Sequence, residues 1–325
     1  MLTSIFRSNQ PIVLTGLLVL VPMLFLPAFF KPVLVPGPHM PLQGLVAMAA
    51  AERPWLQGTL VLLVVMLVAT QLSVLVNDAE LLDRPMYLPA LIFPILLAAF
   101  GPSAPLEPTL LGMPFVLSSL RRTWTMSNTG TVMSTVFDAG MLMGIASMFY
   151  LPYAFLLVVI WASVSVIRPF QWREYVVPLM GHLVVFYFAW AMVELAGSEW
   201  RPLLTIIPSH LDHPSIGTVS DSQRILLGMV LAGVLPVGIL SYSRSYRRGI
   251  MRQKNLLSSF LAVTAAFGIL LLFAWFLTGV LPPVLLALPL VIFTAHAFQG
   301  TKRAWVGESV VFSLLILALW AQWGW

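Results

Sequence analysis

Side chains that could accept a proton are few, because the chain has only 12 acidic residues and 5 histidines. Glu194 is near the end of the apolar segment 175–196, where burying a carboxylate in lipid costs at least ~2.5 kcal/mol without a partner or water. It could act as a general base, or its side chain could extend to the polar edge of the membrane. Glu52 and His39 are the proton acceptors of an earlier polar segment. We take Glu52 and Glu194 as candidate catalytic residues and His39 as a candidate ligand-binding residue.

A second group of polar side chains occupies segment 197–223. The sequence HLDH at 210–213 puts two imidazoles and a carboxylate within four residues. This spacing differs from the i, i+4 histidine pair of helical zinc motifs and no distant third ligand is evident, so we expect no metal. A nearby tryptophan and arginine could stack on a sugar and bind a phosphate. The candidate ligand-binding residues here are Trp200, Arg201, His210, Asp212 and His213.

Four further acids each allow two interpretations. Glu107 precedes Pro108 at the start of a predicted helix, where a carboxylate complements the helix dipole, but it could also be an acid of a ligand-binding site. Asp78, Glu80 and Asp83 fall within six residues of a predicted inner loop. They could dock a basic partner or form a solvated turn.

The hydrophobic composition of the chain indicates that membrane helices position all these residues. Of the 325 residues, 59% are hydrophobic and 9% are charged, compared with about 25% charged residues in soluble domains. The net charge of +5 is better explained by membrane topology than by a nucleic-acid partner. The absence of cysteine excludes disulfides and thiolate nucleophiles.

The hydropathy pattern predicts an all-α, polytopic integral membrane protein in a single domain, residues 1–325, with about 11 transmembrane helices, several of them shorter than the ~20 residues of an upright span. An N-in, C-out arrangement leaves only four of the 17 bases outside, in agreement with the positive-inside bias. Segment 197–223 is then the longest extracytoplasmic loop, and the segment after the first span could form a short helix along the membrane surface. The predicted spans are 11–30, 56–76, 86–101, 106–120, 132–150, 152–167, 175–196, 224–243, 256–279, 281–298 and 308–325.

A predicted helical hairpin in the middle of the chain carries the candidate structural residues. Gly140 and Gly144 are four positions apart and present one bare stripe that lets a neighbouring helix approach closely. Asp138 lies near the start of the first helix, and Arg168 and Arg173 follow the returning helix at the same membrane face. We expect Asp138 to pair with these arginines as a structural clasp.

This region also carries a family resemblance. The sequences FDAG at 137–140, GIASMFY at 144–150 and RPFQWREY at 168–175 resemble the central signature of a bacterial family of polytopic inner-membrane proteins with a domain of unknown function. The opening FRSNQP at 6–11 is similar to the start of that family, and the likeness covers roughly residues 1–185. It implies location in the bacterial inner membrane. More loosely, the order of segments resembles membrane-embedded glycosyltransferases that use polyprenyl-phosphate sugars.

The looser likeness implies an envelope protein that handles a lipid-linked sugar or polyprenyl phosphate, with no other cofactor. Such transferases usually place a catalytic acid directly after the first span, where this chain has Phe29-Phe30-Lys31-Pro32, so catalysis stays open at this point. The alternative is a non-catalytic membrane subunit of an envelope or secretion assembly, with other inner-membrane proteins as partners. A transporter comes third, because buried charges are too few for a coupled ion path. No nucleic-acid-binding motif is present.

Overall fold

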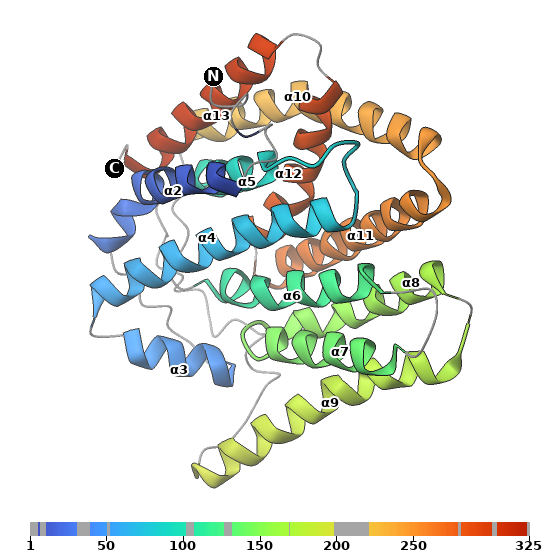
Figure 1. The fold of residues 1–325 in the computed structure, drawn as a ribbon. Coiled ribbons are helices and arrows are strands. Elements are labelled where there is room, and N and C mark those ends of the chain that lie inside the picture. Colours follow the sequence, from blue (N-terminus) through green and yellow to red (C-terminus); the bar gives the residue numbers. More distant parts are fainter. Residues whose placement is uncertain are drawn as a thin grey trace.

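The fold is an assembly of helices (Figure 1). A computed structural model describes residues 6, 11–30, 40–50, 53–101, 107–126, 132–168, 170–197, 221–278, 281–300 and 304–323. All regular elements among them are helical, which confirms the all-α prediction. The elements are η1 (Pro11–Gly16), α2 (Leu17–Phe25), η2 (Leu26–Phe29), α3 (Pro41–Ala50), α4 (Pro54–Asp78), α5 (Leu88–Ala99), α6 (Pro108–Trp124), α7 (Met133–Ser147), η3 (Leu151–Leu156), α8 (Leu157–Ile167), α9 (Trp172–Leu195), α10 (Asp221–Arg248), α11 (Met251–Thr278), α12 (Pro283–Gly300) and α13 (Ala304–Trp323).

Each predicted apolar segment contains a helix, and the short helix expected after the first segment is α3. Helices long and apolar enough to cross a membrane make this a membrane protein, whereas the number of spans and their orientation stay predictions. Among the described residues, five helices have the length and hydropathy of a span: Pro54–Asp78, Trp172–Leu195, Ile225–Arg248, Met251–Leu277 and Trp305–Trp323. The other apolar helices of the described residues are shorter than a span.

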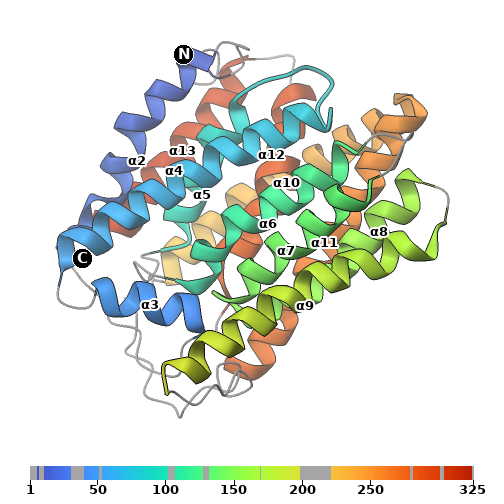
Figure 2. The ribbon, with the colours of Figure 1, turned by 60° about the horizontal axis from the view of Figure 1, so that its bottom comes forward.

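Successive apolar helices run in alternating directions between two ends of the molecule. At one end, which we call the arginine end, Arg121 Nε of α6 donates to Asp78 Oδ2 of α4 at 2.7 Å. At the other, the α3 end, Gln322 Nε2 of α13 donates to the carbonyl oxygen of Gly101 after α5 at 3.0 Å. Figure 2 shows α3 and the last turns of α9 on the same side of the molecule. The α3 end therefore gathers the starts of α4 and α6 and the ends of α5, α7 and α9.

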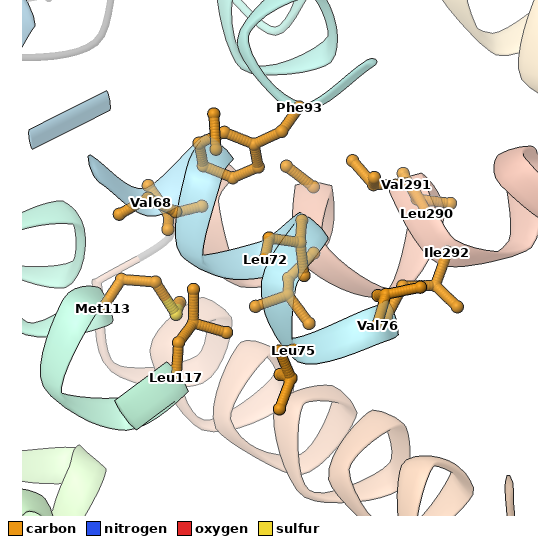
Figure 3. Packing of buried hydrophobic residues seen from close by; sticks show 14 of the residues in the cluster. Val68, Leu72, Leu75, Val76, Phe93, Met113, Leu117, Leu290, Val291 and Ile292 are labelled. Atoms are coloured by element: carbon orange, nitrogen blue, oxygen red, sulfur yellow. The ribbon is translucent and has the colours of Figure 1, made fainter. Parts of the chain in front are cut away.

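The short helix α5 is enclosed by other helices. All 12 residues of α5 are buried, and α5 contacts α4, α12 and α13. Figure 3 shows how Leu72 of α4, Phe93 of α5 and Leu117 of α6 meet in this core. A 12-residue helix is about 18 Å long, which is shorter than the ~30 Å hydrocarbon core. Burial on every side explains how so short and apolar a helix can be stable without facing lipid.

The glycine stripe of α7 packs against α9, which confirms that these glycines form a helix contact. A Cβ atom on Gly140 would collide with the carbonyl oxygen of Pro178 in α9. In return, a Cβ atom on Gly181 of α9 would collide with the carbonyl oxygen of Phe137 in α7. One turn further on, a Cβ atom on Gly144 would lie 3.0 Å from the Cβ atom of Val185. The two backbones touch because these residues have no side chains.

The predicted clasp between Asp138 and the two arginines is wrong. Asp138 Oδ2 accepts a hydrogen bond from Arg122 Nη1 of α6. Arg168 instead forms an ion pair with Glu174, with 3.2 Å between Nη2 and Oε1, and the Arg173 guanidinium lies over the ring of its neighbour Trp172. Because position 138 is about 200° around the helix from position 140, Asp138 points away from α9, whose first turn contains Arg173 and the partner of Arg168.

Candidate functional site

The carboxyl group of Glu107 is the centre of a candidate site at the α3 end. Glu107 is the N-cap of α6, and its backbone oxygen accepts the N–H of Leu110 at 3.0 Å. Its side chain makes no hydrogen bond to the helix backbone. Instead, Oε1 accepts the hydroxyl of Thr109 at 2.6 Å, and Oε2 is buried with no hydrogen-bond partner among the described residues. Glu107 therefore has the position of a helix-start carboxylate, but one oxygen is available to another group.

Two tyrosines from the turn between α7 and α8 complete the cluster. The fully buried Tyr153 donates its hydroxyl to the backbone oxygen of Thr109 at 2.7 Å. Tyr150 meets the ring of Tyr153 edge-on, with 5.2 Å between centroids, and is only half-buried. Gly112 leaves the room for this arrangement, since its Cβ atom would lie 2.7 Å from the Tyr153 ring. Tyr150 is thus more accessible to solvent than Tyr153 in the Glu107 cluster.

Burial changes the proton affinity of Glu107, which lies outside the five candidate spans. Desolvation raises the pKa of this carboxyl to about 7, and the hydrogen bond from Thr109 offsets part of that rise. Burial, and then the charge of Glu107, raise the pKa of Tyr150 to about 12. A carboxyl group whose pKa is near neutral can hold or accept a proton under ordinary conditions, as general acid–base chemistry requires.

We expect wild-type stability to decrease between pH 4.5 and about 7, because Glu107 keeps a proton in the folded state that the unfolded chain has released. Since the folded pKa is the higher one, this contribution is complete below pH 4.5 and is lost as the pH rises through about 7. It corresponds to about 3 kcal/mol. Melting curves in detergent at both pH values should show a smaller decrease for Glu107→Gln, which cannot titrate. Identical pH profiles of wild type and variant would contradict this assignment.

A small apolar cluster closes the site beside Glu107. Leu111, one turn after Glu107, packs with Ala50 at the end of α3 and with Phe149 next to Tyr150. The Phe149 ring also stacks on Phe115 of α6, with 5.7 Å between centroids. These contacts hold the end of α3 against the start of α6, so the surroundings of the carboxyl group are apolar on this side.

The structure separates the candidate residues into two groups. Glu194 is exposed near the end of α9, and no described residue lies within ion-pair or hydrogen-bond distance of its carboxylate. It thus reaches the α3 end without joining the Glu107 cluster. The other candidate catalytic and ligand-binding residues lie outside the described residues: His39, Glu52, Trp200, Arg201, His210, Asp212 and His213.

The acidic residues at the end of α4 and in the loop after it contact other residues of the same chain at the arginine end. Asp78 pairs with Arg121, and the carboxylate of Glu80 lies 3.9 Å from Arg252 of α11. Gln253 Nε2 also donates to the backbone oxygen of Glu80 at 3.2 Å. These intramolecular contacts favour a structural turn over a docking surface for a basic partner.

Comparisons with protein-family models, with curated proteins and with solved structures found no match for this chain. The described residues also contain no group of three or more His, Asp or Glu side chains that could hold a metal ion. A functional assignment therefore depends on the chemistry of the Glu107 cluster. Thr109, Tyr150 and Tyr153 belong to that cluster without having been singled out in the sequence, although the paired tyrosines around Pro152 were a visible signal.

Proposed function

We propose that this protein is a membrane-embedded transferase that acts on a lipid-linked sugar at the extracytoplasmic face, with Glu107 as general base. The observation that carries the proposal is the buried Glu107 carboxyl, whose Oε2 has no partner among the described residues. The pKa of about 7 suits this role, because it allows proton uptake near neutral pH. The looser likeness to polyprenyl-phosphate glycosyltransferases supports the same reaction class.

In the proposed reaction, Glu107 Oε2 takes the proton of an acceptor hydroxyl. The acceptor oxygen forms a bond to the anomeric carbon of the sugar, and the bond from that carbon to the phosphate oxygen breaks. Polyprenyl phosphate leaves with the bonding electrons. Thr109 holds the other carboxylate oxygen at 2.6 Å and so orients Oε2, and the half-buried Tyr150 offers a ring on which a sugar can stack.

Glu107 would supply the acid that polyprenyl-phosphate glycosyltransferases usually place after their first span. In this chain, residues 29–32 contain no acid, and Glu107 comes from the start of α6 instead. The end of α3 packs beside α6 through Ala50 and Leu111, so this short helix lies next to the same site. A base supplied by another helix preserves the chemistry while departing from the expected position.

Native mass spectrometry of protein released gently from its own membranes tests this function. Glu107→Gln keeps the shape of the side chain but removes the base, so we expect this variant to retain the sugar-bearing lipid. Wild type should carry mainly the sugar-free polyprenyl phosphate. Glu194→Gln removes an exposed acid from the same end and is the matched control, with the adducts of wild type. Absence of polyprenyl lipid from all three proteins, or the same adducts in wild type and Glu107→Gln, would overturn the proposal.

A second candidate function is a non-catalytic subunit of an envelope assembly, favoured by the outer face of α9. This helix contacts α7 at Gly181. Tyr187, Phe188 and Trp190, which follow in the second half of the helix, are exposed. Exposed aromatic side chains on a helix of this kind can contact lipid or a neighbouring membrane protein. The same mass spectra decide between the functions, since protein subunits bound in fixed ratio without polyprenyl lipid would support the assembly role.

A further inference from the structure

The turn between α10 and α11 must lie at a membrane surface. Both helices contain candidate spans, Ile225–Arg248 and Met251–Leu277, and only two residues join these spans. Figure 1 shows the two helices meeting at the arginine end, on the right of the molecule. About 20 helical residues cross the ~30 Å hydrocarbon core, so a helix that enters the core at Ile225 leaves it near Arg244. The last turn of α10 then extends into the headgroup region.

Three arginines occupy this projecting end of α10. Arg244, Arg247 and Arg248 have the spacing i, i+3 and i+4, which places them on one face of the helix. All three are exposed, and no described carboxylate lies within 4.0 Å of their guanidinium groups. In contrast, Arg121 and Arg122 at the same end of the molecule both form ion pairs with aspartates. The face of α10 thus presents positive charge that the described part of the chain does not neutralise.

Apolar and aromatic side chains accompany these charges. Tyr246 in the last turn of α10 is 38% exposed, and Ile250 and Met251, which follow that helix, are 67% and 76% exposed. Tyrosine is typical of the membrane interface, where its ring is apolar and its hydroxyl is hydrated. The helix dipole favours bases in the last turn of α10, but it does not account for the exposed apolar side chains beside them. Bases together with exposed apolar groups are the features of a lipid-binding surface.

The turn is held in one position by the acidic loop after α4. Gln253 Nε2 donates to the backbone oxygen of Glu80, and Arg252 lies 3.9 Å from the carboxylate of the same residue. The N–H of Lys254, in the first turn of α11, donates to the backbone oxygen of Ile250 at 3.0 Å. The arginine face is therefore fixed relative to the core, which reduces the entropy lost when it binds a ligand.

We propose that Arg244, Arg247 and Arg248 bind the phosphodiester headgroup of an anionic phospholipid from the surrounding membrane. Guanidinium groups donate paired hydrogen bonds to phosphate oxygens, and arginines on one helix face can share a single phosphate. Tyr246, Ile250 and Met251 contact the upper acyl chains of the same lipid. This site depends on the membrane position of α10 and α11 and is independent of the chemistry proposed for Glu107.

Titration of detergent-solubilised protein with phosphatidylglycerol, followed by native mass spectrometry, tests the site. We expect Arg247→Gln/Arg248→Gln to weaken phosphatidylglycerol binding about 30-fold, as the loss of two bases near a membrane surface implies. Arg121→Gln/Arg122→Gln removes the same charge from the same end of the molecule and is the matched control. Because those arginines are already paired, the control should change binding by less than about threefold.

Equal weakening in the two double variants, or none in either, would overturn the proposal. Arg247→Lys/Arg248→Lys keeps the charge but loses the paired guanidinium hydrogen bonds, so it should bind phosphatidylglycerol more weakly than wild type and more tightly than Arg247→Gln/Arg248→Gln. Wild type provides a further measurement that does not depend on the folding of any variant. Its phosphatidylglycerol binding should weaken as the salt concentration rises, and binding that is insensitive to salt would contradict a charge-based headgroup site.

Discussion

Gly140→Leu is expected to destabilise the protein by about 3 kcal/mol, the upper end of the usual cost of overpacking, because a side chain at this position must enter the backbone of α9. The first atom added, Cβ, already collides with the carbonyl oxygen of Pro178. A flexible side chain could move aside, but this obstacle is the backbone of a long helix. The variant can accommodate leucine only if α7 and α9 separate. Thermal melting in detergent and the yield of folded protein measure this effect.

Two further glycines provide a graded control. Gly144→Leu meets the side chain of Val185 at 3.0 Å, so we expect a smaller loss of stability than at Gly140. Gly233→Leu changes an exposed position in α10 where a Cβ atom has nothing within 4 Å, so the melting temperature should stay close to that of wild type. Unchanged stability and expression of both Gly140→Leu and Gly144→Leu would contradict the close contact of α7 and α9.

Arg168→Met is expected to cost about 3–5 kcal/mol, since it leaves the carboxylate of Glu174 buried without its ion-pair partner. Arg168 and Glu174 have side-chain exposures of only 7% and 2%. The pair joins the end of α8 to the first turn of α9, beside a second link in which Trp161 Nε1 donates to the backbone oxygen of Tyr175 at 2.8 Å. Thermal and chemical denaturation of detergent-solubilised protein measure the loss.

The cost should come from the unpaired buried charge and not from the loss of attraction alone. Arg168→Met/Glu174→Leu removes both charges, so we expect it to regain much of the stability that Arg168→Met loses. Arg121→Met breaks the exposed pair with Asp78 and should cost less than about 1 kcal/mol. The assignment fails if the double variant is as unstable as Arg168→Met, or if Arg121→Met is equally damaging.

The candidate site shows how far sequence reasoning reaches. Glu107 could be named from its position before Pro108, but position alone favoured a helix-start carboxylate. The cluster around it includes Tyr153, which is distant in sequence and reaches Thr109 from the turn after α7. Glu194 seemed the acid most in need of a partner, yet it is exposed on α9. The burial of a residue depends on the neighbours that surround it in the fold. These neighbours are distant in sequence, so a local sequence pattern does not reveal them.

Hydropathy and length were enough to locate the helices and to assign them to a membrane. An apolar run can satisfy its backbone groups in lipid only as a helix or a closed barrel, and runs of this length favour helices, so hydropathy locates them without knowledge of the fold. The bare stripe at Gly140 and Gly144 was likewise visible, because helical spacing places both residues on one face.

Which helices meet and which side chains pair became evident only from the packing of the folded chain. α5 matches the predicted segment 86–101 but is buried on every side, since longer helices surround it. Asp138 pairs with Arg122 and not with Arg168, because its rotational position on α7 turns it towards α6. Hydropathy and spacing are local properties of the sequence. Which helices pack together depends on the shape and charge of helix faces that come from distant parts of the chain. The ion-pair partner of a charged side chain and the burial of an acidic side chain are therefore determined by helix packing.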